Sequence, residues 1–466
     1  MAKILVFDLG TTYFKAALFD RAGRLGRAAR LAPPLARAAD GRLELDPDAF
    51  LATLVDATRR LASDVPDGLA DVEALSFATQ TNSFVLLDAA GSALGPIILW
   101  PDARAAGLED EVRRRCAMPG FTGATGVPGV GAQFMIAKLL WLRQRRPDIW
   151  QRAARLCLVS DYLTLLLTGR HVTEAGAAGL TGLLDIHDAR WWEPVLGAFD
   201  LDRRLLAEPV RAGTDLGPIV PQAAERFSLP GACRFVVGCL DQYAGAIGSG
   251  NVRPGMVSET TGTVLATVRC ADRFQPDPSP EVFQGPGWRQ GLYWRMAFGS
   301  VSANYLEWYR GQLPDRPGFD ELCALAAAVP PGADGLRLRP EAGLTTPGEV
   351  FAGLAPRHAR GHAVRAILEA VAEALRGQVR ALCGDAPPAI IRCAGGAARS
   401  RLWLRIKADT LGVPVATVEC DEPTALGAAA LAESALGDRP VEEIAREWVR
   451  LREPIGPSAD ATRTMS

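Results

Sequence analysis

The sequence predicts an α/β protein built from two domains. Its 466 residues exceed what one hydrophobic core usually serves. Strand-like apolar runs alternate with segments of helical spacing along most of the chain, as in α/β folds. A strand, a Gly-Thr tip and a second strand occupy residues 4–19, and the same pattern returns at residues 256–267. Because this weak repeat indicates internal duplication, we place a domain boundary within residues 235–250, between residues 243 and 244.

The predicted elements support this division in chain order. Asp46-Pro47 is a helix start signal, and Pro147 ends a leucine-rich helix. The Pro- and Gly-rich residues 271–291 are expected to form a surface loop. The predicted strands are residues 4–8, 13–19, two within 73–87, 235–238, 256–259, 264–267, 389–393 and 413–418. The predicted helices are residues 47–63, 138–146, 241–247, 362–383, 401–411 and 424–437.

Composition and charge exclude several functional classes. The chain is 48% hydrophobic and 22% charged, and its net charge is −2, so nothing favours a nucleic acid or an anionic membrane as partner. Nine cysteines are scattered without a CxxC motif, which indicates a reduced, intracellular protein. The N-terminus reads as a strand rather than a signal peptide, and no apolar stretch approaches the ~20 residues of a membrane span. We therefore expect a cytoplasmic protein, and a homodimer is compatible with the sequence.

The first candidate site is Asp8-Leu9-Gly10-Thr11-Thr12, at the turn between the first two predicted strands. Gly10 lets backbone N–H groups approach an anion, and Thr11 and Thr12 add hydroxyl donors. Asp8 could hold a divalent metal through water, as acidic groups in phosphate sites do. The segment also fits an ordinary polar hairpin, so on its own it leaves both interpretations open.

A second turn, Thr260-Thr261-Gly262-Thr263, offers the same chemistry in the other half of the chain. Two such turns, one per domain, could hold a triphosphate from two sides. Residues 394–400 follow a strand and precede a helix, and their Gly395-Gly396 pair permits close approach of a base or a phosphate. A glycine turn between a strand and a helix is also a common structural feature.

Two further segments carry polar side chains suited to a polyhydroxyl substrate. Asp241 ends a strand and opens a small-residue helix, so it is either a helix N-cap or a general base for a sugar hydroxyl. Trp100-Pro101-Asp102-Ala103-Arg104 combines an aromatic ring with an acid and a base, which suits sugar recognition and equally a surface ion pair beside a buried tryptophan. His358 and His362 have helical spacing, but no acid completes a zincin-like set, so we expect no metal there.

Taken in order, these segments resemble the FGGY carbohydrate kinases of the actin-like ATPase superfamily over essentially the whole chain. The resemblance is strongest over residues 395–403 and 407–415, followed by Glu422-Pro423-Thr424-Ala425-Leu426-Gly427. The family's central signature is matched at Lys138-Leu139-Leu140-Trp141-Leu142, whereas Met135 and Arg145 depart from it. The resemblance implies two actin-like (ribonuclease H-like) α/β domains with a central cleft, the N-terminal one binding the sugar and the C-terminal one the nucleotide.

The resemblance also implies a role for each matching residue, with ATP and Mg²⁺ as cofactors. Asp241 is expected to be the catalytic base, and Asp8 the metal-linked acid. The residues expected at the nucleotide are Gly10, Thr11, Thr12, Thr261, Gly262, Thr263, Ala303, Asn304, Glu307, Gly395, Gly396 and Ser400. The residues expected at the sugar are Thr81, Asn82, Trp100, Asp102, Gln133 and Gln242.

The substrate is indicated by fewer residues. The Trp-x-Asp-x-Arg pattern of residues 100–104 is similar to that of xylulokinases, but Thr81-Asn82 matches neither their usual Met-His nor the Arg-Glu of glycerol kinases. We expect ATP-dependent phosphorylation of a ketopentose such as D-xylulose at a terminal hydroxyl. A kinase for another ketose or polyol, of fuculose, ribulose or glycerol type, stays open. So does a non-enzymatic actin-fold ATPase that acts as a nucleotide switch.

Overall fold

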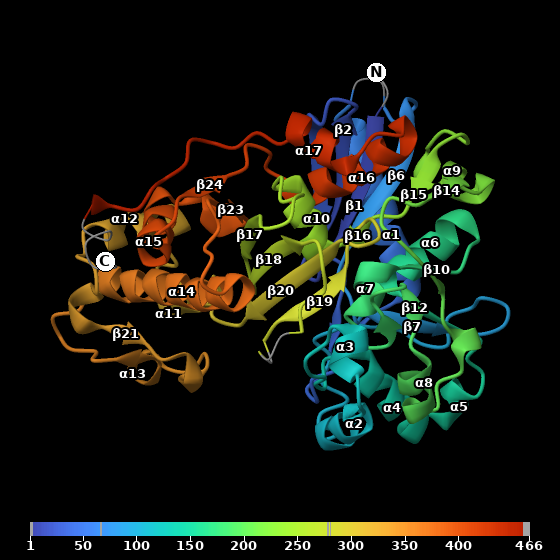
Figure 1. Cartoon of the computed structure of the whole chain (residues 1–466), viewed down its shortest axis with the longest axis horizontal. Helices are drawn as coiled ribbons and strands as arrows, with labels where there is room; N and C mark the ends of the chain where they lie inside the picture. Colours follow the sequence, from blue (N-terminus) through green and yellow to red (C-terminus); the bar gives the residue numbers. More distant parts are fainter. Residues whose placement is uncertain (1–2, 66–67, 277–278, 280, 460–466) are drawn as a thin grey trace. The chain divides into compact units, whose positions relative to one another are not determined.

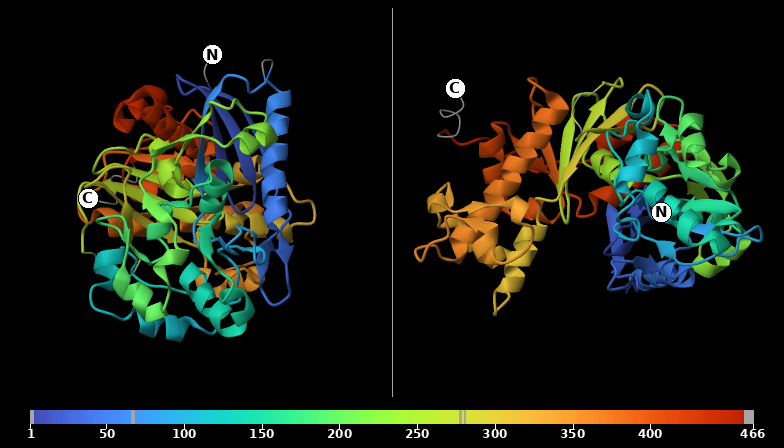
Figure 2. Two further views of the ribbon diagram at one scale, coloured as in Figure 1. Left: turned by 90° about the vertical axis from the view of Figure 1, so that its right-hand side faces the viewer. Right: turned by 90° about the horizontal axis from the view of Figure 1, so that it is seen from below.

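The structure is a computed structural model that describes residues 3–65, 68–276, 279 and 281–459 (Figure 1, Figure 2). The chain divides into two compact units. The first comprises Met1–Val252, Ala271–Arg295 and Cys420–Val449, and the second comprises Arg253–Cys270, Met296–Glu419 and Arg450–Ser466. The two units are therefore interleaved along the sequence. The boundary between residues 243 and 244 stays a prediction about where the two halves of the sequence meet.

The first unit is built on a seven-stranded sheet of order β14-β15-β6-β1-β2-β3, with β16 also paired to β6. The strands are β1 (Lys3–Leu9), β2 (Phe14–Asp20), β3 (Leu25–Leu31), β6 (Val72–Thr79), β14 (Asp215–Pro218), β15 (Arg234–Val236) and β16 (Cys239–Leu240). β1 and β2 form the predicted antiparallel hairpin, whereas β1, β15 and β16 all run parallel to β6. The carboxyl ends of β1, β6 and β16 therefore lie at one edge of the sheet.

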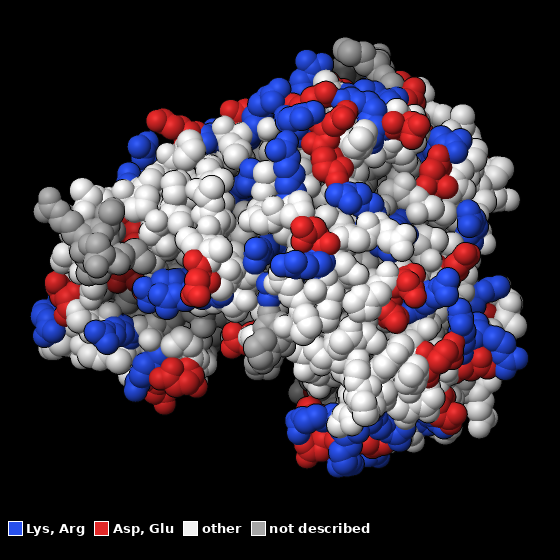
Figure 3. Space-filling model, in the orientation of Figure 1, with Lys and Arg blue, Asp and Glu red and all other residues white. Residues whose placement is uncertain are grey.

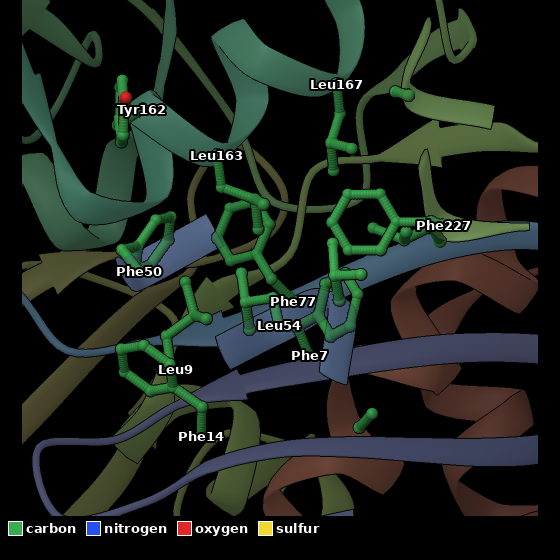
Figure 4. Packing of buried hydrophobic residues seen from close by; sticks show 14 of the residues in the cluster. Phe7, Leu9, Phe14, Phe50, Leu54, Phe77, Tyr162, Leu163, Leu167 and Phe227 are labelled. Carbon is green, nitrogen blue, oxygen red and sulfur yellow. The ribbon is translucent and has the colours of Figure 1, made fainter. Parts of the chain in front are cut away.

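The core of the first unit forms where helix α1 (Pro47–Ser63) covers this sheet. Asp46 caps the helix through its side chain, and Pro47 occupies the first turn, as the start signal predicted. Phe50 of α1 meets Phe14 of β2 edge to face, with ring centroids 5.5 Å apart (Figure 4). Burial of this apolar face, more than helix propensity, holds α1 on the sheet.

Helices α10 (Asp241–Gly248) and α16 (Pro423–Gly437) cross at very close range within the first unit. A Cβ atom on Gly248 would lie 1.8 Å from the carbonyl oxygen of Pro423, and one on Gly427 would lie 1.9 Å from that of Ala244. Only glycine fits at either position, because any side chain would overlap the backbone of the other helix. The crossing fixes the helix that begins with Asp241.

A smaller antiparallel sheet belongs to the same unit and has the order β4-β5-β8-β7-β9. Its strands are β4 (Ala36–Arg37), β5 (Leu43–Leu45), β8 (Ile97–Ile98), β7 (Phe84–Leu87) and β9 (Arg155–Leu158). Helix α4 (Met135–Arg145) shares an apolar cluster with β7 and β9, which includes Leu139 and Phe84. Because α4 begins three residues before the predicted start, Lys138 lies inside the helix.

The second unit is organised on the neighbouring strands β18, β17, β23 and β24, which lie side by side in this order. They are β17 (Val257–Thr261), β18 (Leu265–Ala271), β23 (Ile391–Ala394) and β24 (Val415–Thr417). β17 pairs antiparallel with β18 and parallel with β23. The long helix α14 (Arg360–Cys383) packs against α12 (Phe319–Ala327) and α15 (Arg401–Leu411).

The prediction of a surface loop at residues 271–291 is wrong over its second half. The strand β19 (Phe283–Pro286) of the first unit forms there, and Gln284, Gly285 and Pro286 are buried. The backbone N–H of Gln284 donates to the carbonyl of Gly126 at 2.8 Å. A residue distant in the sequence therefore satisfies a buried backbone donor of this segment.

Charged side chains of both signs are interspersed on the face shown in Figure 3. All nine cysteines are free thiols, as their scattered spacing led us to expect. In the part of the chain that the structure describes, no helix combines the length and the apolar character that crossing a lipid bilayer requires.

Candidate active site

Three neighbouring parallel strands of the first unit end together at one edge of the large sheet. Leu9 of β1 stands opposite Thr79 of β6, and Thr79 stands opposite Leu240 of β16. The residues that this register gathers at the edge are Asp8, Gly10, Gln80 and Asp241. The carboxyl edge of parallel strands is where open α/β sheets usually bind their ligands.

Asp8 is nearly buried at this edge, with 8% of its surface exposed. The Nζ atom of Lys15 lies 3.3 Å from Oδ2 of Asp8 and 2.7 Å from Oε2 of Glu422, so one ammonium group bridges two carboxylates. Burial raises the pKa of Asp8, Lys15 opposes the rise, and the charge of Glu422 adds to it. A cation bound beside Asp8 would therefore stabilise its ionised form.

Asp241 opens α10 without capping it. The N-cap position belongs to Leu240, and Oδ1 of Asp241 accepts a 2.7 Å hydrogen bond from the N–H of its neighbour Gln242. Burial raises the pKa of Asp241 to about 7, the charge of Asp8 adds to the rise, and the Gln242 N–H opposes it. The residue nonetheless stays partly accessible. Its second oxygen, which has no hydrogen-bond partner among the described residues, is free to accept a proton from a bound hydroxyl.

Trp100 is held from three directions. Its backbone N–H donates to the Ser83 hydroxyl at 2.8 Å, and its carbonyl accepts a 2.7 Å bond from Lys138. Its indole Nε1–H donates to the hydroxyl of Thr11 at 2.8 Å. The Thr11 hydroxyl in turn lies 3.4 Å from Oε1 of Gln80. The structure thus joins a segment predicted to face a sugar to the first Gly-Thr turn.

The side-chain polar atoms of Thr81 and Asn82 form hydrogen bonds within the protein. The Thr81 hydroxyl donates to the carbonyl of Ala177 at 2.6 Å. The Asn82 amide accepts the N–H of Met135 at 2.8 Å and donates to the carbonyl of Leu180 at 3.1 Å. A sugar contact stays a prediction for both residues, and it would compete with these bonds.

Asp102 forms a buried ion pair instead of the surface pair that the sequence left open. It is 1% exposed, and its oxygens accept four bonds of 2.6 to 2.9 Å from the Leu43 N–H, the Arg104 N–H and the Arg104 guanidinium. Burial raises the pKa of Asp102, but the bonds from Arg104 and Leu43 outweigh it, so the pKa lies below its usual value. A sugar could contact this carboxylate only by displacing one of these donors.

Other predicted residues of the first unit keep their polar groups accessible. Gln133 and Thr12 are exposed, and Gln242 and Gly10 are partly exposed. In the described chain no hydrogen bond engages the side chains of Gln133, Thr12 or Gln242. These residues can therefore contact a ligand without breaking an internal bond.

In the second unit, the hydroxyl of Thr261 belongs to a buried network. Nζ of Lys407 donates to Oε1 of Glu259 at 2.6 Å and to the Thr261 hydroxyl at 2.8 Å. The hydroxyl donates to Oε2 of Glu259 at 2.6 Å, and all three residues are at most 1% exposed. A contact between Thr261 and a nucleotide, which stays a prediction, would therefore have to come from the backbone.

The turn after β17 is closed by residues 302–304. The carbonyl of Gly262 accepts the Ser302 hydroxyl at 2.7 Å and the Ala303 N–H at 3.2 Å. Oδ1 of Asn304 accepts the N–H of Ser302 at 3.1 Å. The structure thus brings Gly262, Ala303 and Asn304 together, as the resemblance implied for a common site.

Thr263 and Glu307 are both exposed. Glu307 lies on α11 (Asn304–Gln312) and pairs with Arg310, one turn along the same helix, at 2.8 Å. Neither side chain is fixed by a long-range bond in the described chain, so contact of either with a nucleotide stays a prediction.

Gly395 brings the third predicted loop against the second. Its φ is 84°, and a Cβ atom there would lie 2.8 Å from the carbonyl oxygen of Thr261, so both features require glycine. Gly396 is exposed beside it. Ser400 caps α15, because its hydroxyl accepts the N–H of Trp403 at 3.3 Å.

Sequence reasoning missed Glu174, which supports the strand before Asp241. Glu174 is 3% exposed and caps α7 (Ala175–Gly179), because its carboxylate accepts the N–H groups of Gly176 and Ala177 at 2.6 and 2.8 Å. It also accepts the N–H of Leu240 at 3.2 Å. Burial raises the pKa of Glu174 to about 7, against the effect of these three bonds. An acid directly before a run of small residues is the sequence signal that could have indicated this cap.

Known proteins resemble the chain over nearly its whole length. Residues 3–248 match the N-terminal domain of the FGGY family of carbohydrate kinases, and residues 260–436 match its C-terminal domain. A glycerol kinase of Aromatoleum aromaticum is 31% identical over 96% of this chain and 93% of its own length. A xylulose kinase of Lactococcus lactis is 29% identical over 81% of this chain and 76% of its own. An L-fuculokinase of Salmonella typhi is 28% identical over 96% of this chain and 95% of its own length.

Solved structures confirm the fold. A xylulose kinase of Lactobacillus acidophilus matches with a TM-score of 0.90 at 23% identity, covering 100% of this chain and 95% of the other. A gluconate kinase of the same organism matches with a TM-score of 0.89 at 23% identity, covering 99% of this chain and 95% of the other. The predicted two-domain α/β fold is thus confirmed, and the chain belongs to the FGGY family of carbohydrate kinases.

Proposed function

We propose that this chain transfers the γ-phosphoryl group of ATP to a terminal hydroxyl of a small neutral sugar, with a ketopentose such as D-xylulose as its preferred substrate. The observation that carries the proposal is the carboxylate of Asp241, which has an oxygen free of internal bonds and a pKa of about 7. Such a group can take the proton of a hydroxyl within hydrogen-bond reach while the phosphoryl group moves. The similarity to xylulose kinases supports the choice of a ketopentose.

The cations that contact predicted site residues of the first unit are already engaged, which favours a neutral substrate over a sugar acid. Lys15, Lys138 and Arg104 are each already bound to carboxylates or backbone carbonyls. A carboxylate on the substrate would therefore meet the charges of Asp8 and Asp241 without a free cation among these three residues. The accessible polar side chains predicted for the sugar are amides, which suit hydroxyl groups. A substrate of the kind named for the related gluconate kinase fits this site less well.

The nucleotide is assigned to turns whose backbone is accessible, and Asp8 to Mg²⁺. Mg²⁺ at phosphate sites is usually held by one or two carboxylates together with phosphates and water. Asp8 fits this pattern as a single, nearly buried carboxylate two residues before Gly10. When bound, Mg²⁺ would neutralise charge on the phosphates. The accessible turn residues assigned to the nucleotide are Gly10, Thr12, Gly262, Thr263 and Gly396.

A coupled assay for ADP release over a panel of acceptors tests this proposal. The panel contains D-xylulose, L-ribulose, L-fuculose, D-fructose, glycerol and gluconate, each with ATP and Mg²⁺. We expect strict dependence on an acceptor and the highest kcat/KM with a ketopentose. The highest kcat/KM with gluconate would contradict the neutral substrate. ATP turnover that no acceptor stimulates would favour the nucleotide switch instead.

A further inference from the structure

Lysine is rare in this chain. Of the 51 lysine and arginine residues, only Lys3, Lys15, Lys138 and Lys407 are lysines. Lys15 bridges the two carboxylates described above, and Lys138 and Lys407 are each 0% exposed. The donors of a guanidinium group lie in one plane, whereas an ammonium group directs three donors away from one small centre. The two fully buried lysines, Lys138 and Lys407, therefore occupy positions where an ammonium group can direct its donors to several closely spaced acceptors.

Lys138 joins two segments of the first unit through their backbone. Its Nζ atom donates to the carbonyl of Leu99 at 2.9 Å, to that of Trp100 at 2.7 Å and to that of Gln133 at 2.9 Å. Trp100 and Gln133 are both predicted to face the sugar. Burial lowers the pKa of Lys138 to about 7, while the charge of Asp102 opposes this effect. An ammonium group buried at such a cost, with three carbonyls as its partners, fixes the relative position of the two segments.

Lys407 plays the corresponding part in the second unit. With Glu259 and the Thr261 hydroxyl it forms a closed triangle of bonds between 2.6 and 2.8 Å. Lys407 lies on α15, the helix that follows the loop of Gly395, and the carbonyl of Thr261 packs directly against Gly395. The triangle therefore holds the end of β17, and with it the two turns predicted to face the nucleotide.

We infer that Lys138 and Lys407 are positioning residues for different substrates, Lys138 for the sugar and Lys407 for the nucleotide. The inference rests on the proposed kinase function and assigns one buried lysine to each substrate. Neither ammonium group contacts a substrate itself, because both are fully buried. A lysine with a merely structural role would change stability and affect both substrates alike.

Steady-state kinetics of the full chain test whether Lys138 acts on the sugar and Lys407 on the nucleotide. We expect Lys138→Met and Lys138→Arg to raise the KM for the sugar about 10-fold or more and to leave the KM for ATP within about 2-fold. Lys407→Met and Lys407→Arg should do the reverse. Arginine should not rescue either position, because its planar donors cannot reach the same partners. Lys3→Arg is the matched control: Lys3 pairs with Asp71 at 2.8 Å near the surface, and both KM values should stay unchanged.

Equal shifts of both KM values, or full rescue by arginine, would overturn the inference. If a methionine variant does not fold, the arginine variant of the same lysine takes its place. Calorimetric titration with ADP needs no turnover, and there Lys407→Arg should weaken binding about 10-fold while Lys138→Arg leaves it unchanged. Equal ADP affinity in both variants would also overturn the inference. Absence of sugar-dependent turnover in the wild-type chain would overturn the proposed function, and the ADP titration would still decide the role of Lys407.

Discussion

Trp100 donates a 2.8 Å hydrogen bond from its indole Nε1–H to the hydroxyl of Thr11. The bond connects a residue predicted to face the sugar with one predicted to face the phosphates, inside a single unit. The Thr11 hydroxyl also lies close to the side-chain oxygen of Gln80, which follows β6. A movement of the Trp100 indole would therefore reach the first Gly-Thr turn directly, whereas Lys138 holds only the backbone carbonyl of Trp100.

A double-mutant cycle on Trp100 and Thr11 should detect this connection. Trp100→Phe removes the donor and keeps a ring, and Thr11→Val removes the acceptor at nearly constant volume. We expect the two changes in kcat/KM to be less than additive, with a coupling energy of about 1 kcal/mol. Trp100→Phe combined with Thr12→Val is the control, because Thr12 is exposed and should give an additive result. An additive result for Thr11 as well would show that the bond has no role in turnover.

Asp241→Asn should lower kcat by at least about 100-fold, since an amide cannot take the proton of the acceptor hydroxyl. ADP binding, measured by calorimetry, should stay close to that of the wild-type chain. Turnover within about tenfold of wild type would remove Asp241 from the role of general base.

The pH dependence of kcat/KM should report the ionisation of Asp241. Its carboxyl has a pKa of about 7 and must be ionised to accept a proton. The value of kcat/KM should therefore rise with pH below about 7 and level off above it. In Asp241→Asn, the residual kcat/KM should no longer rise with pH in this range. A rise that persists unchanged would have to come from the ionisation of another group.

Asp241 should also make the fold less stable as pH rises from about 4 to 7. Its pKa in the folded chain lies above the usual 3.8, so over this interval the folded state binds more protons than the unfolded state. Stability therefore falls with rising pH through this group. We expect the Tm of Asp241→Asn, relative to wild type, to be higher at pH 8 than at pH 5 in scanning calorimetry. A Tm difference that does not depend on pH would contradict the raised pKa.

Gly248→Ala should destabilise the first unit, because the new methyl group would overlap the carbonyl of Pro423. We expect a loss of about 1–3 kcal/mol in the free energy of unfolding, measured by urea denaturation. Gly197→Ala is the matched control in another helix, α8 (Glu193–Phe199), where a Cβ atom meets nothing within 4 Å. That change should be neutral or stabilising by up to about 1 kcal/mol. Equal stability of the two variants would show that α10 can move away from α16.

The sequence predicted the ends of those helices that are capped by residues adjacent in the sequence. Helix α1 begins at Pro47 and ends at Ser63, as predicted, because Asp46 caps it from the adjacent position. Helix α4 begins at Met135, earlier than predicted, because its first N–H is accepted by Asn82, which is distant in the sequence. Bonds of this kind leave no local pattern that sequence reasoning could use.

The same distinction holds for the candidate site. The residue types of Asp8, Gly10 and Asp241, at or beside the ends of predicted strands, predict a phosphate turn and a base, and both assignments stay predictions. The engagement of Asp102 by Arg104 and Leu43, and of Thr261 by Lys407, depends on the tertiary fold. The sequence can therefore propose segments for the site, whereas only the tertiary structure shows which of their polar atoms are already engaged.

The interleaving of the two units has a consequence for biosynthesis. Helix α16, which packs against α10, β1 and β6, belongs to the segment Cys420–Val449 and is translated after every strand of the seven-stranded sheet. Until the ribosome has added it, the nascent chain carries α10 with its glycine surface uncovered. The first unit can therefore complete its core only after α16 has been translated, and an amino-terminal fragment that ends before α16 should need chaperones or aggregate.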